Sequence, residues 1–139
     1  MKSAPSKQTI PSLNLTMLKC KIHRATVTDA DLNYEGSVSI DPKLIEAAGL
    51  LPYERVDIYN CNNGARFSTY VIVGGPGEIC LNGAAARHVH KGDIVIIAAY
   101  CSMDANSAKS YQPTAIFVDS KNKVKTLDNY GKKTFPKKK

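Results

Sequence analysis

Short stretches in which apolar and polar residues alternate make up most of the chain, and this period of two predicts β-strands. Residues 17–27 carry the first such pattern. Residues 55–73 are rich in Val, Ile, Tyr and Phe, and Asn63-Gly64 interrupts them with a strong hairpin signal. Five further strands are predicted for residues 32–40, 78–81, 93–100, 115–119 and 124–127.

Helical patterns are few and short. Residues 41–49 are predicted to form a helix, because Asp41 can cap it, Pro42 suits its first turn and Gly49 can end it. Residues 83–87 predict at most one helical turn, and residues 105–110 are a weak helical candidate. Residues 29–31 are predicted as a turn, and Gly74–Gly77 as another. Many short strands between frequent turns indicate a mainly β fold, either a small barrel or a sandwich.

The 139 residues provide room for one domain, and 43% hydrophobic with 22% charged residues is ordinary for a globular protein. No apolar run approaches the roughly 20 residues that span a membrane, and the N-terminus lacks the apolar stretch of a signal peptide. We therefore predict a cytoplasmic protein without a membrane partner. Composition divides the chain into a flexible extension (1–16), a folded body (17–120) and a Lys-rich tail (121–139).

The net charge of +7 resides in the two ends of the chain. Residues 121–139 hold eight Lys and one Asp, whereas residues 17–120 hold nine basic and eleven acidic residues. A basic tail can contact an acidic partner, so a nucleic-acid-binding module is one alternative. The near-neutral body, which lacks an aromatic and basic face, favours a solvated tail, and a nucleic-acid partner is not expected.

Neither the cysteines nor the histidines form a metal-binding pattern, so we predict no metal site. The cysteines have no CxxC pair and are expected to stay reduced as small buried side chains. The histidines could bind a metal only if the fold brought them close together. These residues are Cys20, Cys61, Cys80 and Cys101, with His23, His88 and His90.

The dipeptide Gly36-Ser37 stands out because it lies inside a predicted strand. Glycine weakens a strand and often marks a β-bulge, which is the favoured interpretation of the dipeptide alone. A Gly-Ser bond also permits a rare reaction, in which the serine hydroxyl attacks the preceding carbonyl and turns the amide into an ester.

Five segments in order give this dipeptide a wider context. They are residues 21–28 (KIHRATVT), 32–37 (LNYEGS), 62–70 (NNGARFSTY), 81–86 (LNGAAA) and 92–97 (GDIVII). Together they resemble the pyruvoyl-dependent aspartate 1-decarboxylase family over about residues 17–120. The resemblance implies a double-psi β-barrel with short helices, a homotetramer with active sites between subunits, and conversion of L-aspartate to β-alanine and CO₂ for pantothenate biosynthesis.

The resemblance also implies self-cleavage between Gly36 and Ser37. Attack by the Ser37 hydroxyl gives an ester, elimination leaves dehydroalanine, and hydrolysis gives a pyruvoyl group on the chain 37–139. Such a group accepts the electrons left when CO₂ departs from the carbon bearing the substrate amine, so the cofactor performs the difficult step. Thr69 matches the family position that assists processing by hydrogen bonding near the scissile carbonyl.

Substrate roles follow from the same resemblance. Arg66 matches the ligand of a substrate carboxylate, which a guanidinium can bind through two parallel hydrogen bonds. Tyr70 matches the proton donor to the carbanion, and Lys21 matches a lysine near the second carboxylate. Other pocket positions implied are Asn82, Gly83, Ala84 and Ala85, with Tyr34 and His23 at its side and Tyr59 where some members carry Trp. The alternative with the same fold is a non-catalytic barrel in which Ser37 stays a serine.

Overall fold

A computed structural model describes residues 12–129, and the remaining parts of the predicted extension (1–16) and Lys-rich tail (121–139) lie outside the described residues. The described strands, in chain order, are β1 (Asn14–Thr26), β2 (Asp29–Asp31), β3 (Ser37–Ile40), β4 (Arg55–Asn60), β5 (Arg66–Val73), β6 (Ile79–Asn82), β7 (Ile94–Asp104), β8 (Thr114–Val118) and β9 (Val124–Asn129). The helical segments are α1 (Pro42–Ala48), η1 (Gly83–His88) and α2 (Ala105–Ala108), of which η1 is a 3₁₀-helix. The expectation of a mainly β protein with short helices is confirmed.

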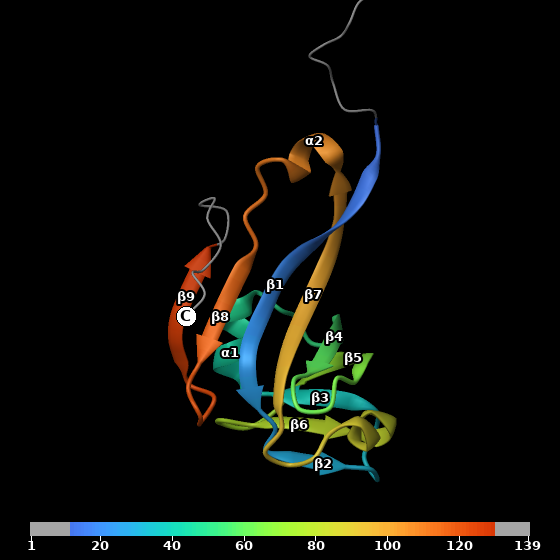
Figure 1. The fold of residues 1–139 in the computed structure, drawn as a ribbon, viewed down its shortest axis with the longest axis vertical. Coiled ribbons are helices and arrows are strands. Elements are labelled where there is room, and N and C mark those ends of the chain that lie inside the picture. The colour runs from blue at the N-terminus through green and yellow to red at the C-terminus, as the bar shows by residue number, and fades with distance from the viewer. Residues whose placement is uncertain (1–11, 130–139) are drawn as a thin grey trace, which may run out of the picture.

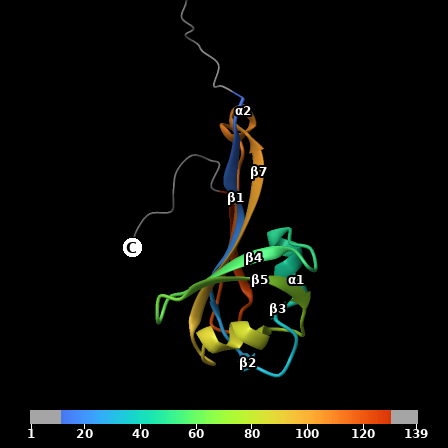
Figure 2. The ribbon, with the colours of Figure 1, turned by 90° about the vertical axis from the view of Figure 1, so that its right-hand side faces the viewer.

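The described strands join in the order β2-β6-β3-β5-β4-β7-β1-β8-β9. The long strands β1 and β7 pair antiparallel, whereas β3 pairs parallel with β5 and antiparallel with β6. Figure 1 shows β2, β3 and β6 running across the lower end of β1 and β7. Figure 2 shows β1 and β7 nearly edge-on, with α1 to one side of them and α2 at their upper end. The strand β3, which begins at Ser37, is thus enclosed between β6 and β5.

The core gathers the inward-facing residues of these strands. Alternation sets which residues are buried: in β4, Val56, Ile58 and Asn60 are buried, and the two residues between them are half-buried. β3 and β6 are buried at every position, so the two serines of β3 and Asn82 of β6 are enclosed along with the apolar residues. The largest fully buried side chains include Ile22, Ile40, Leu44, Ile58, Ile79, Leu81, Ile97 and Ile116.

The predicted helix after β3 is confirmed with both of its ends. The Asp41 side chain accepts a hydrogen bond of 2.8 Å from the backbone N–H of Lys43. Gly49 ends α1 in the left-handed conformation, with φ of +76°, which glycine adopts without a steric cost. Gly77, in the predicted turn after β5, donates its backbone N–H to the second Asp41 carboxylate oxygen at 2.8 Å. Asp41 therefore joins α1 to the turn before β6.

The prediction of one strand over residues 32–40 is confirmed for Ser37–Ile40 and wrong for residues 32–36. Residues 29–31, predicted as a turn, form the strand β2, which pairs parallel with β6 from Asp29 opposite Cys80 to Asp31 opposite Asn82. Residues 32–36 connect the two strands without regular pairing, and β3 starts at Ser37. The pairing of β2 depends on β6, some fifty residues away, so local composition carries no signal for it. Gly36 is consequently the last residue before a strand and lies outside it.

The expectation that the four cysteines are buried holds for two of them. Cys20 and Cys80 are buried, whereas Cys61 is exposed and Cys101 is half-buried. Cys61 lies in the turn that connects β4 to β5, where the chain faces solvent. All four are free thiols. Among residues 12–129, no helix is both long enough and apolar enough to cross a membrane.

Candidate active site

Ser37 is the best-enclosed polar residue of the predicted site, with no exposed surface. Its hydroxyl donates a hydrogen bond of 2.9 Å to the carbonyl oxygen of Glu35. The same oxygen accepts a hydrogen bond of 2.9 Å from Nδ2 of Asn82, which lies directly opposite Ser37 in the β3–β6 pairing. The Ser37 hydroxyl, the candidate nucleophile, is therefore fixed by two hydrogen bonds, one to the Glu35 carbonyl and one from the Asn82 amide.

Asn82 is fixed in this orientation by its other contacts. Nδ2 also donates to the Ser39 hydroxyl at 3.0 Å, and the Cys80 thiol donates to Oδ1 at 3.2 Å. Burial, followed by the charges of Glu78 and two aspartates, raises the pKa of Cys80 to about 11, so that the thiol keeps its proton at neutral pH. The sequence suggested that Asn82 lines a substrate pocket; the contact between its amide and the serine hydroxyl was not predicted.

Gly83 packs directly against the backbone of the Gly-Ser dipeptide. A Cβ on Gly83 would lie 2.6 Å from Gly36 Cα and 2.7 Å from Gly36 N, closer than real contacts allow. Its φ of +65° also lies in the left-handed region that favours glycine. The adjoining alanines differ, because Ala84 is exposed and Ala85 is buried. The turn that the sequence predicted to line a pocket thus lies against the Gly36 backbone.

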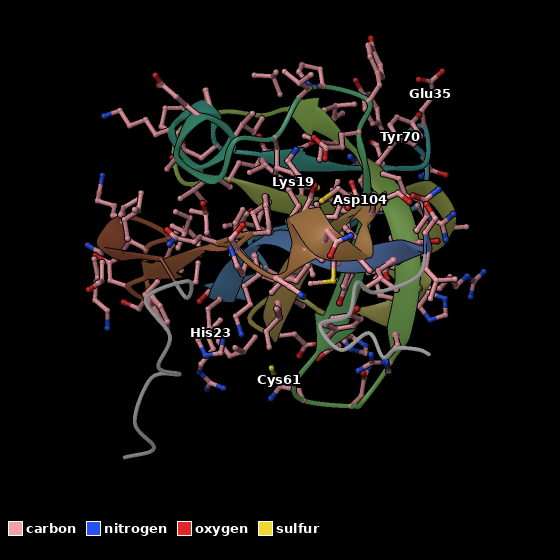
Figure 3. All side chains as sticks on the ribbon, turned by 90° about the horizontal axis from the view of Figure 1, so that it is seen from above. Lys19, His23, Glu35, Cys61, Tyr70 and Asp104 are labelled. Atoms are coloured by element: carbon pink, nitrogen blue, oxygen red, sulfur yellow. The ribbon has the colours of Figure 1, made fainter. Side chains whose placement is uncertain are left out.

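Strand register places Tyr70 and Arg66 on one face of the sheet with Ser37. Val38 pairs with Val71, so Ser37 and Tyr70 occupy the preceding positions of neighbouring strands. Arg66 lies four residues before Tyr70 on β5 and shares its face. Figure 3 shows Tyr70 on the same side of the molecule as Glu35, whose carbonyl oxygen accepts the hydrogen bond from the Ser37 hydroxyl.

Thr69 lies on the opposite face of β5 from Tyr70, because successive side chains alternate along a strand. It pairs with Val56, a core residue of β4. Figure 3 shows the side chain of Tyr70 on the side of the molecule that carries Glu35. Thr69 therefore lies on β5, the neighbour of β3, and the register places its side chain on the core face of the sheet.

Lys21 shares the face of Arg66 and Tyr70 but lies farther along the sheet. It pairs with Ala98 on β7, which pairs with Asp57 on β4, which pairs with Ser68 on β5. Directly opposed residues share a face, so this row connects Lys21 to the position between Arg66 and Tyr70. Three strand spacings of about 4.8 Å separate β1 from β5, or roughly 14 Å. Within one chain, Lys21 is thus three strands along the sheet from the strand that carries Arg66 and Tyr70.

The two residues predicted at the side of the pocket have different surroundings. Tyr34 is 55% exposed in the loop before β3. The His23 ring lies 5.2 Å from that of Phe117, and its Nδ1 atom is buried without a hydrogen-bond partner among the described residues. Burial, together with the charges of Lys21 and Arg24, lowers the pKa of His23, so the ring is neutral at pH 7. Figure 3 shows His23 far from Tyr70 within one chain.

The structure is that of a small, mainly β protein with a fully buried serine hydroxyl at a Gly-Ser peptide. A family model described as aspartate decarboxylase matches residues 13–125. The chain belongs to the aspartate decarboxylase family, which confirms the resemblance seen in its sequence.

Several relatives carry the name aspartate 1-decarboxylase. The protein of Bdellovibrio bacteriovorus is 70% identical over 112 residues, which cover 81% of this chain and 90% of that protein. The protein of Syntrophus aciditrophicus is 67% identical over 111 residues, covering 78% and 96%. The protein of Pelotomaculum thermopropionicum is 61% identical over 112 residues, covering 79% and 85%.

Proposed function

We propose that the protein is a self-processing aspartate 1-decarboxylase that converts L-aspartate to β-alanine and CO₂ for pantothenate biosynthesis. Family membership and relatives of that name at 61–70% identity support the reaction. The observation that carries the self-processing is the Ser37 hydroxyl, fully buried and held between the Glu35 carbonyl and the Asn82 amide.

Cleavage begins when Ser37 Oγ attacks the carbonyl carbon of Gly36. A C–O bond forms, the C–N bond breaks, and the hydroxyl proton passes to the nitrogen of Ser37, so an amide becomes an ester. The Asn82 amide restrains the hydroxyl oxygen through its hydrogen bond, and the close packing of Gly83 against the Gly36 backbone restrains the scissile peptide. We assign Thr69 a hydrogen bond near the scissile carbonyl. Elimination then releases residues 1–36 and leaves dehydroalanine at position 37, which water converts to a pyruvoyl group with loss of ammonia.

The surroundings of Ser37 suit a pyruvoyl group formed in place. The position is fully enclosed, so a keto group there is shielded from bulk water. Its neighbour Asn82 offers amide N–H donors that can hold a carbonyl oxygen as they hold the hydroxyl. When present, the group serves as an electron sink for the carbanion left by decarboxylation.

The chain's own residues bind and orient the substrate. Tyr70 donates the proton that completes β-alanine. Arg66, exposed at the start of β5, pairs with a substrate carboxylate; four strand residues, about 13 Å, separate it from Tyr70, so it reaches the pocket from a neighbouring subunit. Asn82, Gly83, Ala84 and Ala85 line the pocket at the end of β6. Lys21 contacts the second carboxylate from a neighbouring subunit, since its own chain holds it three strands away.

We further propose a double-psi β-barrel, spanning residues 17–120, that assembles as a homotetramer. For closure of the barrel, support comes from Thr28, which follows β1 and hydrogen-bonds to the Ile79 carbonyl through its backbone N–H at 2.7 Å and its hydroxyl at 3.0 Å. These bonds connect the end of β1 to β6. For the assembly, support comes from exposed apolar side chains, among them Leu32, Leu51 and Tyr53.

The test compares the wild-type protein with Ser37→Ala. The wild-type chain should break at Gly36-Ser37 and release β-alanine from L-aspartate, whereas the variant should stay whole and inactive. A wild-type chain that stays whole through prolonged incubation and makes no β-alanine would favour the non-catalytic barrel. β-Alanine formation by Ser37→Ala at the wild-type rate would refute the mechanism.

A further inference from the structure

Three polar side chains linked by hydrogen bonds lie beside Arg66 on the exposed face of the sheet. The hydroxyl oxygens of Tyr59 and Tyr100 are 2.7 Å apart, and the Tyr59 hydroxyl lies 3.3 Å from Oδ2 of Asp57. A carboxylate only accepts, so Tyr59 donates its single proton to Asp57. Tyr100 must then be the donor to Tyr59. The hydrogen bonds therefore run in one direction, from Tyr100 through Tyr59 to Asp57.

Strand register explains why these residues meet. Asp57 and Tyr59 lie two residues apart on β4 and share a face. On the neighbouring antiparallel strand β7, Ala98 pairs with Asp57 and Ile96 pairs with Tyr59, so Tyr100 shares their face but lies on the other side of the Asp57–Ala98 pair from Tyr59. The two tyrosine side chains extend toward each other across this pair, and their hydroxyls meet. Tyr59 pairs on its other side with Arg66 of β5. The Tyr59 ring is thus bordered by Tyr100 on one strand and by Arg66 on the other.

Arg66 uses the Tyr59 ring as a support. Its guanidinium carbon lies 4.0 Å from the ring centroid, within the range of a cation–π interaction. Such a contact occupies the face of the guanidinium and consumes none of its N–H donors, which remain available for a carboxylate. Arg66 is exposed, so the orientation of its guanidinium depends on the orientation of this ring.

We propose that Tyr100 is a positioning residue for substrate binding: its hydroxyl fixes the Tyr59 ring, which orients the Arg66 guanidinium toward the substrate carboxylate. The inference rests on the proposed function, because that function gives Arg66 its ligand. Tyr100 itself contacts neither the scissile peptide nor, in this scheme, the substrate. Its hydroxyl should therefore affect substrate affinity and leave cleavage unaffected.

The experiment measures steady-state kinetics of Tyr100→Phe with L-aspartate. KM should rise about threefold to tenfold, the effect of one lost hydrogen bond, while kcat changes less than twofold. The inhibition constant of succinate, a dicarboxylate without an amine, should rise by the same factor, because succinate also depends on Arg66. Tyr111→Phe is the matched control: it removes a hydroxyl that donates to the Lys19 carbonyl and has no hydrogen bond to Asp57, Tyr59 or Tyr100 among the described contacts, and it should leave both constants unchanged.

A double variant separates positioning from a general structural effect. In an Arg66→Ala background, Tyr100→Phe should cause no further loss of kcat/KM, because the residue through which it acts is gone. If Tyr100→Phe fails to fold, Tyr59→Phe removes the same hydrogen bond from the other side and should show the same rise in KM. Unchanged KM in an active enzyme, or an equal further loss in the Arg66→Ala background, would overturn the inference. A cleaved wild-type enzyme without turnover would instead contradict the proposed function.

Discussion

Replacing Gly83 with alanine tests how closely the turn after β6 controls the scissile peptide. The new Cβ would lie 2.6 Å from Gly36 Cα, 2.7 Å from Gly36 N and 3.0 Å from the Tyr34 carbonyl oxygen. Carbon atoms are in comfortable contact at about 3.5–4.0 Å, so Gly36 and Gly83 must separate by roughly 1 Å. All three contacting atoms are backbone, and no flexible side chain can move aside to relieve the contact.

Two costs follow, and they affect different measurements. The left-handed backbone of residue 83 costs about 1–2 kcal/mol of stability for a residue with a Cβ. The displacement of Gly36 moves the carbonyl carbon relative to Ser37 Oγ, and a misplacement of about 1 Å can slow a reaction about 100-fold. We therefore expect Gly83→Ala to cleave itself about 100 times more slowly than the wild-type chain.

The assay follows the fraction of whole chain by intact-mass spectrometry after purification under denaturing conditions and refolding. Gly92→Ala is the matched control, because Gly92 also has a positive φ, +94°, but no atom within 4 Å of its would-be Cβ. The control carries only the cost of the left-handed backbone, so it should lose less melting temperature than Gly83→Ala and cleave at the normal rate. If Gly83→Ala is cleaved as fast as Gly92→Ala, the scissile peptide does not depend on Gly83.

Three further changes separate processing, turnover and stability. Asn82→Ala should slow cleavage at least tenfold, measured by intact mass, because the Ser37 hydroxyl loses its only described side-chain donor. The control Ser39→Ala removes a different hydrogen bond of the same amide and should cleave normally. Tyr70→Phe should yield two chains but form β-alanine about 10²–10⁴-fold more slowly, and a normal rate would exclude Tyr70 as the proton donor. Burial lowers the pKa of His23, so folding opposes its protonation, and stability should fall as pH drops below about 6.5. The loss of melting temperature between pH 7.5 and 5.5 should be smaller in His23→Gln, and an equal loss would show that another group causes it.

The sequence predicted those parts of the fold that short-range chemistry determines. Asp41 and Gly49 define the ends of α1 because capping needs only neighbouring residues. Asn63-Gly64 marks the connection between β4 and β5 for the same reason. The strand β2 was not predicted, because its polar residues form a strand only through pairing with β6. Local composition at residues 29–31 indicates a turn, and tertiary pairing overrides it.

For the site, the resemblance supplied the residues but not their contacts. Ser37, Arg66 and Tyr70 were named from ordered motifs, and the register of β3 with β5 now places them on one face. The amide of Asn82 on the serine hydroxyl could not be deduced, because it depends on the antiparallel pairing of β3 with β6, 45 residues apart. Tyr100 carried no signal at all, since its partner lies 41 residues away on another strand. Side-chain contacts across a sheet require a known register, which a single sequence does not specify.

The mass of the purified protein tests the central claim most directly. The account predicts two polypeptides, residues 1–36 ending in a free carboxylate and residues 37–139 lighter by one ammonia than a chain beginning with serine. The same sample should convert L-aspartate to β-alanine. A single unbroken polypeptide that still forms β-alanine at an undiminished rate would contradict the account.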